Sequence, residues 1–297
     1  MSIYVEKTDI GATLGTWLYC AYQFLYAAEQ GCGEKAYISW PNDPRRSLQP
    51  HQDPAMFAQC PNMYEWWFKQ PFYDTAPPRT ETWVCEEGPP ASRGGGKRLG
   101  DFNIFQQPLQ VIKDTYRRYL KFNDATQKRI DDLVVKYGID FDNTIGVGWR
   151  GCDSYVDGRP RLPIEVYFPF IDDILAQEPN LKIFATAEET LVTDRIVSHY
   201  PGRVFTIPEI FSAPWGYKEH SEYVNPASGY ERGVQTCQLI AILSRCKYLI
   251  KNRSSVSSTA CWLSYGKSVN IAHPENLGFG FDITKAEIDG KLVPLYR

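Results

Sequence analysis

Histidine is scarce in this chain, with 4 residues among 297, and these four lie far apart in the sequence. A zinc site built on histidine and a histidine-based catalytic triad therefore have little material here. The 8 cysteines are scattered, and no two of them form a CxxC motif. We therefore expect reduced thiols rather than a disulfide framework, and a protein that uses no metal and no cofactor.

The chain also lacks a long basic run and a long apolar run. Its 32 Lys and Arg residues are interspersed with 35 Asp and Glu residues, for a formal net charge of −3, which argues against a nucleic-acid partner. The apolar stretches are far shorter than the roughly 20 residues of a membrane helix. The N-terminal segment shows no basic region followed by an apolar one. We expect a cytoplasmic protein with no transmembrane segment.

The length and composition are those of a globular protein with two domains. Hydrophobic residues make up 43% of the chain and aromatic residues 14%, and 297 residues provide enough chain for two cores. We predict an N-terminal domain over residues 1–142 and a C-terminal domain over residues 143–297.

The first half opens with a β-α-β pattern. Residues 2–5 and 35–40 are typical of strands, and residues 16–29 between them have the apolar content of a helix. Such units build parallel sheets covered by helices. Residues 86–100 show no periodicity and are interpreted either as a plain surface loop or as a lid. Residues 108–136 are expected to form one helix, closed by Gly138.

The second half alternates between strand and helix patterns, which predicts a second doubly wound domain. The overall expectation is an α/β protein in which two Rossmann-like domains face each other across a cleft. The expected strands are 143–149, 182–186, 203–207, 248–251 and 268–271, and the expected helices are 163–178, 190–199, 232–244 and 255–264.

Three of these strands end in polar residues, and ligands of parallel sheets sit beyond the carboxyl ends of the strands. Arg150 follows the first strand directly, and its permanently charged guanidinium is suited to two oxygens of a diphosphate. Asp153 is placed to orient that arginine or to contact a sugar hydroxyl. The alternative interpretation is an ion pair of Arg150 and Asp153 that braces a loop.

The other two strand ends allow a binding and a structural interpretation. Thr186 and Glu188 are suited to ribose hydroxyls or a base edge, or they form the capped first turn of the next helix. Residues 251–258 carry hydroxyls and free N–H groups at the start of a helix, next to the cations Lys251 and Arg253, which favours an anion site. Ordinary helix caps are the alternative for its serines.

These strand ends lie in stretches that resemble the second domain of nodulation-type and core α1,6-fucosyltransferases, with their α1,2 relatives. The resemblance rests on GVGWRGCDSY, KIFATAEET, RGVQTCQLIAILSRCKYLI and NRSSVSSTACWLS, which follow in the same order and spacing. The opening segment 11–18 is similar to the glycine-rich first loop of these enzymes. The resemblance implies a GT-B fold and an inverting, metal-independent transfer from GDP-fucose to a glycan hydroxyl.

Carried over by position, the resemblance places Arg150 on the donor diphosphate and Asp153 on the closing aspartate of the arginine motif. It places Glu188 in the nucleoside pocket and Ser254 with Ser255 near the β-phosphate. The full set expected to bind the donor is Gly15, Arg150, Thr186, Glu188, Arg253, Ser254, Ser255 and Val256.

The chain also departs from the family pattern. Gly148-Trp149-Arg150-Gly151 stands where the motif has His-x-Arg-Arg, and the segment 237–239 lacks the aspartate that reads guanine in relatives. Fucose is therefore the first expectation for the sugar. The alternatives are another donor, such as a UDP-pentose or a rhamnose nucleotide, and a catalytically inactive module that binds a glycan or a nucleotide.

Inverting transfer needs a base that removes the proton of the acceptor hydroxyl. Asp157 lies near the position of the family's acidic residue, with Asp153 as the alternative, although Asp157-Gly158 is also a turn signal. We expect the first domain to bind the acceptor glycan, through Glu65 and Trp66, and the second domain to bind the nucleotide-sugar donor. Core packing is the alternative role for this aromatic stretch.

Overall fold

The computed structural model describes residues 3–7, 14–40, 56, 59–60, 62–85, 108–151, 163–213, 227, 229–252, 254–271, 285–288 and 291–294. The chain divides into two compact units, which are Met1–Asp131 with Ala227–Gln238, and Asp132–Pro226 with Leu239–Arg297. The sequence predicts one domain boundary, between residues 142 and 143. In the structure, residues 227–238 belong to the first unit again. The roles assigned to the two domains stay predictions.

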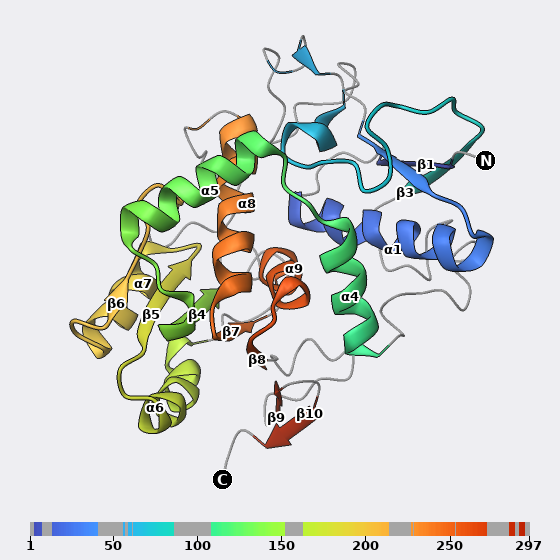
Figure 1. Cartoon of the computed structure of the whole chain (residues 1–297). Helices are drawn as coiled ribbons and strands as arrows, with labels where there is room; N and C mark the ends of the chain where they lie inside the picture. The colour runs from blue at the N-terminus through green and yellow to red at the C-terminus, as the bar shows by residue number, and fades with distance from the viewer. Residues whose placement is uncertain are drawn as a thin grey trace. The chain divides into compact units, whose positions relative to one another are not determined.

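The first unit contains a parallel sheet with the strand order β2-β1-β3, of which β1 and β3 are labelled in Figure 1. The predicted β-α-β start of the chain is confirmed, whereas β3 lies in a stretch where no strand was predicted. Gly33 ends α1 with a φ of 66°, a conformation that glycine adopts without strain. The elements up to this point are β1 (Ile3–Lys7), α1 (Leu14–Cys32), β2 (Ala36–Ser39), the 3-10 helix η1 (Met63–Trp66) and β3 (Glu81–Cys85).

The prediction of one helix over residues 108–136 is wrong, because two helices form there. They are α4 (Leu109–Tyr119) and α5 (Asp124–Tyr137). Asn123 starts the second one, since its Oδ1 accepts a hydrogen bond from the Thr126 N–H at 2.9 Å. Gly138 follows α5 with a φ of 56°, as expected for a helix end.

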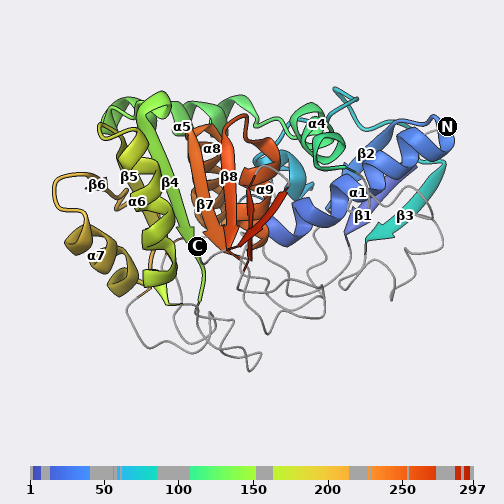
Figure 2. The same cartoon turned by 90° about the horizontal axis from the view of Figure 1, so that it is seen from below.

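The second unit is built on a sheet with the order β10-β9-β8-β7-β4-β5-β6, of which β8 to β6 are parallel. Figure 2 shows β4, β7 and β8 side by side. Each strand and helix predicted after residue 142 has a counterpart, although the predicted helix 163–178 begins as a 3-10 helix and the predicted strand 203–207 is reduced to Val204–Phe205. The antiparallel strands β9 and β10 were not predicted. The strands are β4 (Thr144–Trp149), β5 (Lys182–Ala187), β6 (Val204–Phe205), β7 (Tyr248–Asn252), β8 (Lys267–Ile271), β9 (Lys285–Ile288) and β10 (Lys291–Pro294).

Helices cover both faces of this sheet. Alternate strand residues point to opposite sides, so each face has its own core. Ile183 and Ile250 pack in a core with α6 and α7, whereas Phe184 and Leu249 pack in a second core with α5, α8 and α9. The helical elements of this part of the chain are η4 (Phe141–Asn143), η5 (Ile164–Tyr167), α6 (Phe168–Gln177), α7 (Thr190–His199), α8 (Gly229–Arg245) and α9 (Ser255–Leu263).

The strand order reverses between β4 and β7. From β4 the chain moves to β5 and β6 on one side, and it then continues to β7 and β8 on the other side. In open parallel sheets, ligands bind at the carboxyl ends of the strands where the order reverses. The architecture therefore predicts a site beyond Trp149 and Asn252, the last residues of β4 and β7.

Glycines let β4 lie close to α8. A Cβ atom on Gly146 would meet the side chains of Leu243 and Cys246 at 3.0 and 3.1 Å, so a larger residue requires these side chains to shift. On the same face, a Cβ on Gly148 would have ordinary contacts at 3.5 Å and beyond.

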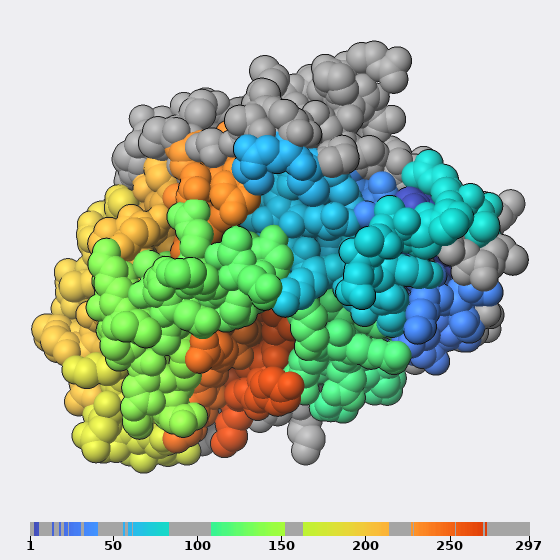
Figure 3. Space-filling model, turned by 45° about the horizontal axis from the view of Figure 1, so that its top comes forward, coloured from blue at the N-terminus to red at the C-terminus, as the bar shows by residue number. Residues whose placement is uncertain are grey.

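The helix α5 lies at the molecular surface, where it is drawn in green in Figure 3. Within the described ranges, no helix is long and apolar enough to cross a membrane. Four described cysteines are free thiols, in line with the expectation of reduced cysteines. They are Cys60, Cys237, Cys246 and Cys261.

Gly146→Val is expected to lower the free energy of unfolding by about 1–3 kcal/mol, because its methyl groups overpack the contact between β4 and α8. Denaturation in urea measures the change. Gly148→Ala is the control on the same strand and face, and it should cost less than half as much. Equal losses for the two variants would contradict the close contact at Gly146.

Candidate functional site

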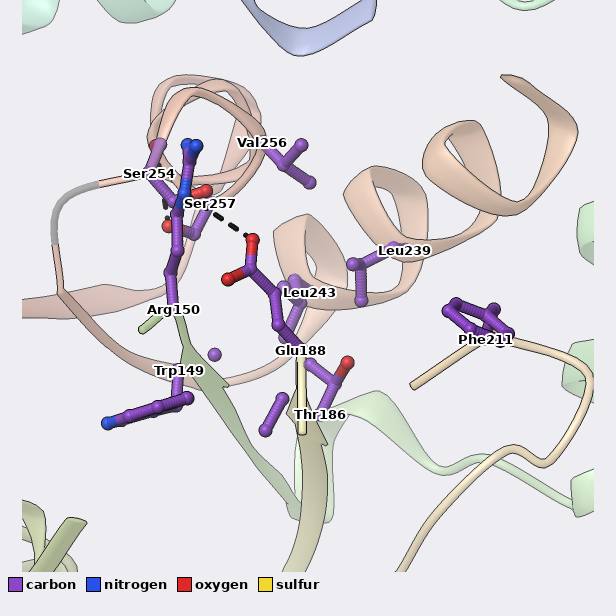
Figure 4. A pocket seen from close by; sticks show the side chains of 12 residues that line it. Trp149, Arg150, Thr186, Glu188, Phe211, Leu239, Leu243, Ser254, Val256 and Ser257 are labelled. Carbon is purple, nitrogen blue, oxygen red and sulfur yellow. Dashed lines mark hydrogen bonds and ion pairs between the residues drawn. The ribbon is translucent and has the colours of Figure 1, made fainter. Parts of the chain in front are cut away.

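A pocket of about 100 Å³ lies at the carboxyl ends of β4 and β5, beside the start of α9. Figure 4 shows that its walls differ in chemistry. Arg150, Glu188 and Ser254 form a polar side, and Phe211 and Leu239 lie toward the other side; Leu243 also lines the pocket. One wall is thus suited to a charged group and the other to a flat apolar one.

Arg150 is fixed through its main chain by a neighbouring strand. Its N–H donates to Oδ1 of Asn252 at 2.9 Å, and its carbonyl accepts from Nδ2 of Asn252 at 2.6 Å. Asn252 ends β7 and is only 9% exposed, so this amide ties the end of β4 to the end of β7. The sequence interpretation placed Asn252 at the third strand end but assigned it no role.

The side chain of Arg150 meets Glu188, which follows β5. Its Nε lies 3.4 Å from Oε1 of Glu188, and the other carboxylate oxygen accepts the Gly151 N–H at 3.2 Å. The two side chains are 25% and 21% exposed. Gly151 must be a glycine here, because a Cβ atom would come within 1.9 Å of the Trp149 ring. The arginine is thus held at the mouth of the pocket by groups on both adjacent strands.

The start of α9 supplies the second half of the polar side. Ser254 is the N-cap residue with extended backbone, and its carbonyl accepts the Ser258 N–H at 2.8 Å. Ser257 donates to the carbonyl of Asn252 at 3.2 Å, and the buried Lys251 donates to the hydroxyl of Ser258 at 3.2 Å. A helix N-terminus carries partial positive charge and attracts anions. Arg150 and this helix start therefore favour an anion between them.

Several predicted donor residues line this pocket. The structure brings together Arg150, Thr186, Glu188, Ser254 and Val256, whereas Ser255 lies in the first turn of α9 and is not one of the lining residues. The alternative in which Thr186 caps the next helix is wrong, because the N-cap of α7 is Glu189.

Of the remaining predicted donor-binding and catalytic residues, the structure describes only Gly15. Gly15 lies in the first turn of α1, since that helix begins at Leu14 rather than at residue 16. Asp153, Asp157 and Arg253 lie outside the described residues, as does the segment 86–100, and their roles stay predictions.

The apolar wall includes part of the segment 237–239, which lacks the aspartate that the family resemblance implies. Of the residues 237–239, Leu239 lines the pocket. Cys237 is fully buried, and Gln238 is 4% exposed and donates to the carbonyl of Arg129 at 3.2 Å. In the described part of the chain, the only carboxylate that lines the pocket is that of Glu188.

Glu65 lies in a hydrogen-bond network of the first unit. Its Oε1 accepts from the Tyr37 hydroxyl at 2.5 Å, from Nδ2 of Asn62 at 3.0 Å and from Nε2 of Gln70 at 3.0 Å. Burial, followed by the bond to Glu65, raises the pKa of Tyr37 well above its usual range. The carboxylate thus connects β2 to the segment after η1, which is a structural role.

Trp66 is packed rather than open to a sugar. The side chain is 3% exposed, and its Nε1 donates to the carbonyl of Cys60 at 2.8 Å. The core-packing alternative is therefore favoured over a stacking face for the acceptor. Among the residues that the structure describes, no group of three or more His, Cys, Asp or Glu side chains is placed to hold a metal ion.

Two solved structures resemble this chain in fold. The α-1,6-fucosyltransferase NodZ soaked with GDP-fucose has a TM-score of 0.52 at 15% identity, and 98% of each chain is covered. Arabidopsis thaliana FUT1 in complex with GDP has a TM-score of 0.50 at 12% identity, with 92% of this chain and 71% of the other covered. No protein-family model and no curated protein matches the sequence. The likeness confirms the predicted GT-B fold.

Asn252→Ala is expected to lower the free energy of unfolding by about 1–3 kcal/mol, because it leaves the N–H and carbonyl of Arg150 without these partners in a buried setting. Thermal or urea denaturation checks this. Asn180→Ala is the control, since Asn180 is exposed in the same unit. We call the two hydrogen bonds between Asn252 and the main chain of Arg150 the clamp. A loss of stability no larger than that of the control would contradict a stabilising role of the clamp.

Glu65→Ala is expected to destabilise the protein by about 1–3 kcal/mol, because the donors around Oε1 lose a shared acceptor. Glu65→Gln keeps an acceptor oxygen and should lose less than half as much. Unchanged stability of Glu65→Ala would contradict the structural role. The prediction that Glu65 binds the acceptor would then be favoured.

Proposed function

We propose that this chain is a glycosyltransferase that transfers a sugar from a nucleoside-diphosphate donor to a hydroxyl of a glycan. Fucose is the first candidate for the sugar, and the transfer inverts the anomeric carbon without a metal ion. The observation that carries the proposal is Arg150, held at the point of strand-order reversal and directed toward the start of α9 (Figure 4).

The chemistry of transfer explains why such an arginine is needed. As the bond between the sugar and the diphosphate breaks, negative charge grows on the leaving diphosphate. The guanidinium of Arg150 and the N-terminus of α9 lie where they can stabilise that charge. GDP and GDP-fucose in the two fucosyltransferase structures of similar fold support a nucleotide sugar as the donor.

The acceptor hydroxyl must lose a proton as it attacks the anomeric carbon. We assign this role to Asp157, with Asp153 as the second candidate, because both follow Arg150 closely in sequence. A carboxylate matches the need for a base that is ionised at neutral pH.

A second donor class is favoured by the apolar wall. Guanine presents N–H donors that a carboxylate would accept, whereas Leu239 and Phe211 offer only apolar contact. The described residues thus leave room for a donor with another base, such as a UDP-pentose or a rhamnose nucleotide. Glu188 is the one described carboxylate at this pocket, and it faces Arg150.

A panel of GDP, UDP, dTDP and CDP, with EDTA or with magnesium, tests the donor class by thermal shift. At a free concentration roughly 100 times the Kd, the bound nucleotide should add about 2.7 kcal/mol of stability. The largest shift with GDP supports fucose, and the largest shift with UDP or dTDP supports the alternative donors. A shift that requires magnesium would contradict the metal-free mechanism, and the lack of any shift would contradict the proposal.

Arg150→Ala is expected to weaken binding of the best nucleoside diphosphate by about 10- to 100-fold, because a charge-assisted contact contributes about 1.5–3 kcal/mol. Calorimetric titration measures the affinity, and release of nucleoside diphosphate from the sugar nucleotide measures turnover. Arg195→Ala removes an arginine of an exposed ion pair in the same unit and serves as the control.

Equal affinities of Arg150→Ala and the wild type would rule out the diphosphate site. A wild type that binds the nucleotide and a glycan but turns over no sugar nucleotide would favour the inactive binding module.

A further inference from the structure

Glu188 contacts the arginine site at two places. Oε1 lies 3.4 Å from Nε of Arg150, and Oε2 accepts the N–H of Gly151 at 3.2 Å. The carboxylate therefore spans from the end of β5 to the two residues that follow β4. Because the side chains are only 25% and 21% exposed, water screens this ion pair less than it would screen a surface pair.

Glu188 contacts only one edge of the Arg150 guanidinium in this ion pair. A guanidinium offers Nε on its side and two terminal nitrogens at its end, in a rigid plane. The ion pair with Glu188 involves Nε, and in Figure 4 the terminal end of Arg150 lies beside Ser254 at the start of α9. The contact with Glu188 thus engages one edge of the guanidinium, while the terminal end points toward the start of α9.

Arg150 is held on both sides of its strand. Asn252 of β7 binds its main chain with two hydrogen bonds, and Glu188 after β5 binds its side chain. An arginine without such support loses rotamer freedom when a ligand immobilises it, which weakens binding. A prearranged guanidinium avoids that loss.

We propose that Glu188 is a positioning residue that orients Arg150 for the donor diphosphate, and that it is not a ligand of the donor's ribose. The inference rests on the proposed function, since it concerns the same site. It assigns to this carboxylate a role different from the nucleoside contact that the family resemblance implies.

Two other roles for Glu188 predict different results. A ribose ligand would affect only ligands that carry a ribose. A carboxylate that competes with phosphate for Arg150 and Gly151 would weaken binding in the wild type, so its removal would strengthen binding. Positioning through Arg150 weakens the binding of every diphosphate, with or without a ribose.

The experiment is calorimetric titration of inorganic pyrophosphate, of the best-binding nucleoside diphosphate and of its 2′-deoxy form. The proteins are the wild type, Glu188→Ala, Glu188→Gln, Arg150→Ala and the double variant of Arg150→Ala with Glu188→Ala. Glu165→Ala, which removes the carboxylate of the exposed pair with Arg195, is the matched control. Circular dichroism confirms that each variant is folded.

We expect Glu188→Ala to weaken pyrophosphate and both nucleotides by the same factor, about three- to tenfold, and Glu188→Gln to weaken them less. In the Arg150→Ala background, the further loss of Glu188 should change nothing, because the arginine it positions is gone. Glu165→Ala should bind like the wild type.

Three results would overturn the inference. One is a loss for the ribonucleotide alone with pyrophosphate unchanged, which would make Glu188 a ribose ligand. Another is tighter binding in Glu188→Gln, which would make it a competitor. The last is an equal, additive loss in the Arg150→Ala background. A wild type that binds none of these ligands would contradict the proposed function together with the inference. The three results above contradict the inference alone, because in each of them the wild type still binds.

Discussion

The attachment of Arg150 to its two neighbouring strands is the interaction on which the site depends. The chain leaves β4 at this residue, and the strand order reverses there between β4 and β7. Asn252 holds the main chain at that point, and Glu188 meets the side chain from β5. A single cation is thereby fixed at the place where parallel sheets bind ligands. The helix start at Ser254 completes the environment for an anion.

The packing below this residue explains the shape of the pocket. Gly146 and Gly148 carry no side chains on the face of β4 that meets α8, so that helix approaches closely and presents Leu239 and Leu243 to the cavity. The same face therefore combines an apolar wall with a charged rim. Such a combination suits a ligand with a flat apolar part and a diphosphate, as a nucleotide sugar has.

Much of the second unit could be predicted from the sequence, because apolar periodicity and helix caps are local signals. The parallel order of the strands also predicted that Arg150, Glu188 and Ser254 would meet, since their carboxyl ends share an edge of the sheet. The clamp by Asn252 could not be predicted, because an amide reveals its partner only in the folded state. The same applies to Glu65, whose donors come from β2 and from separate loop segments. The break before α5 had a local signal, the capping Asn123, that the helical periodicity obscured.

The most direct test of the central claim is a crystal structure of the chain with its best-binding nucleoside diphosphate, grown without divalent metal. We predict that the terminal nitrogens of Arg150 bind a phosphate oxygen at about 2.7–2.9 Å, beside the start of α9, with Glu188 still at Nε. A nucleotide bound elsewhere, or an Arg150 turned away from the phosphates, would contradict the account.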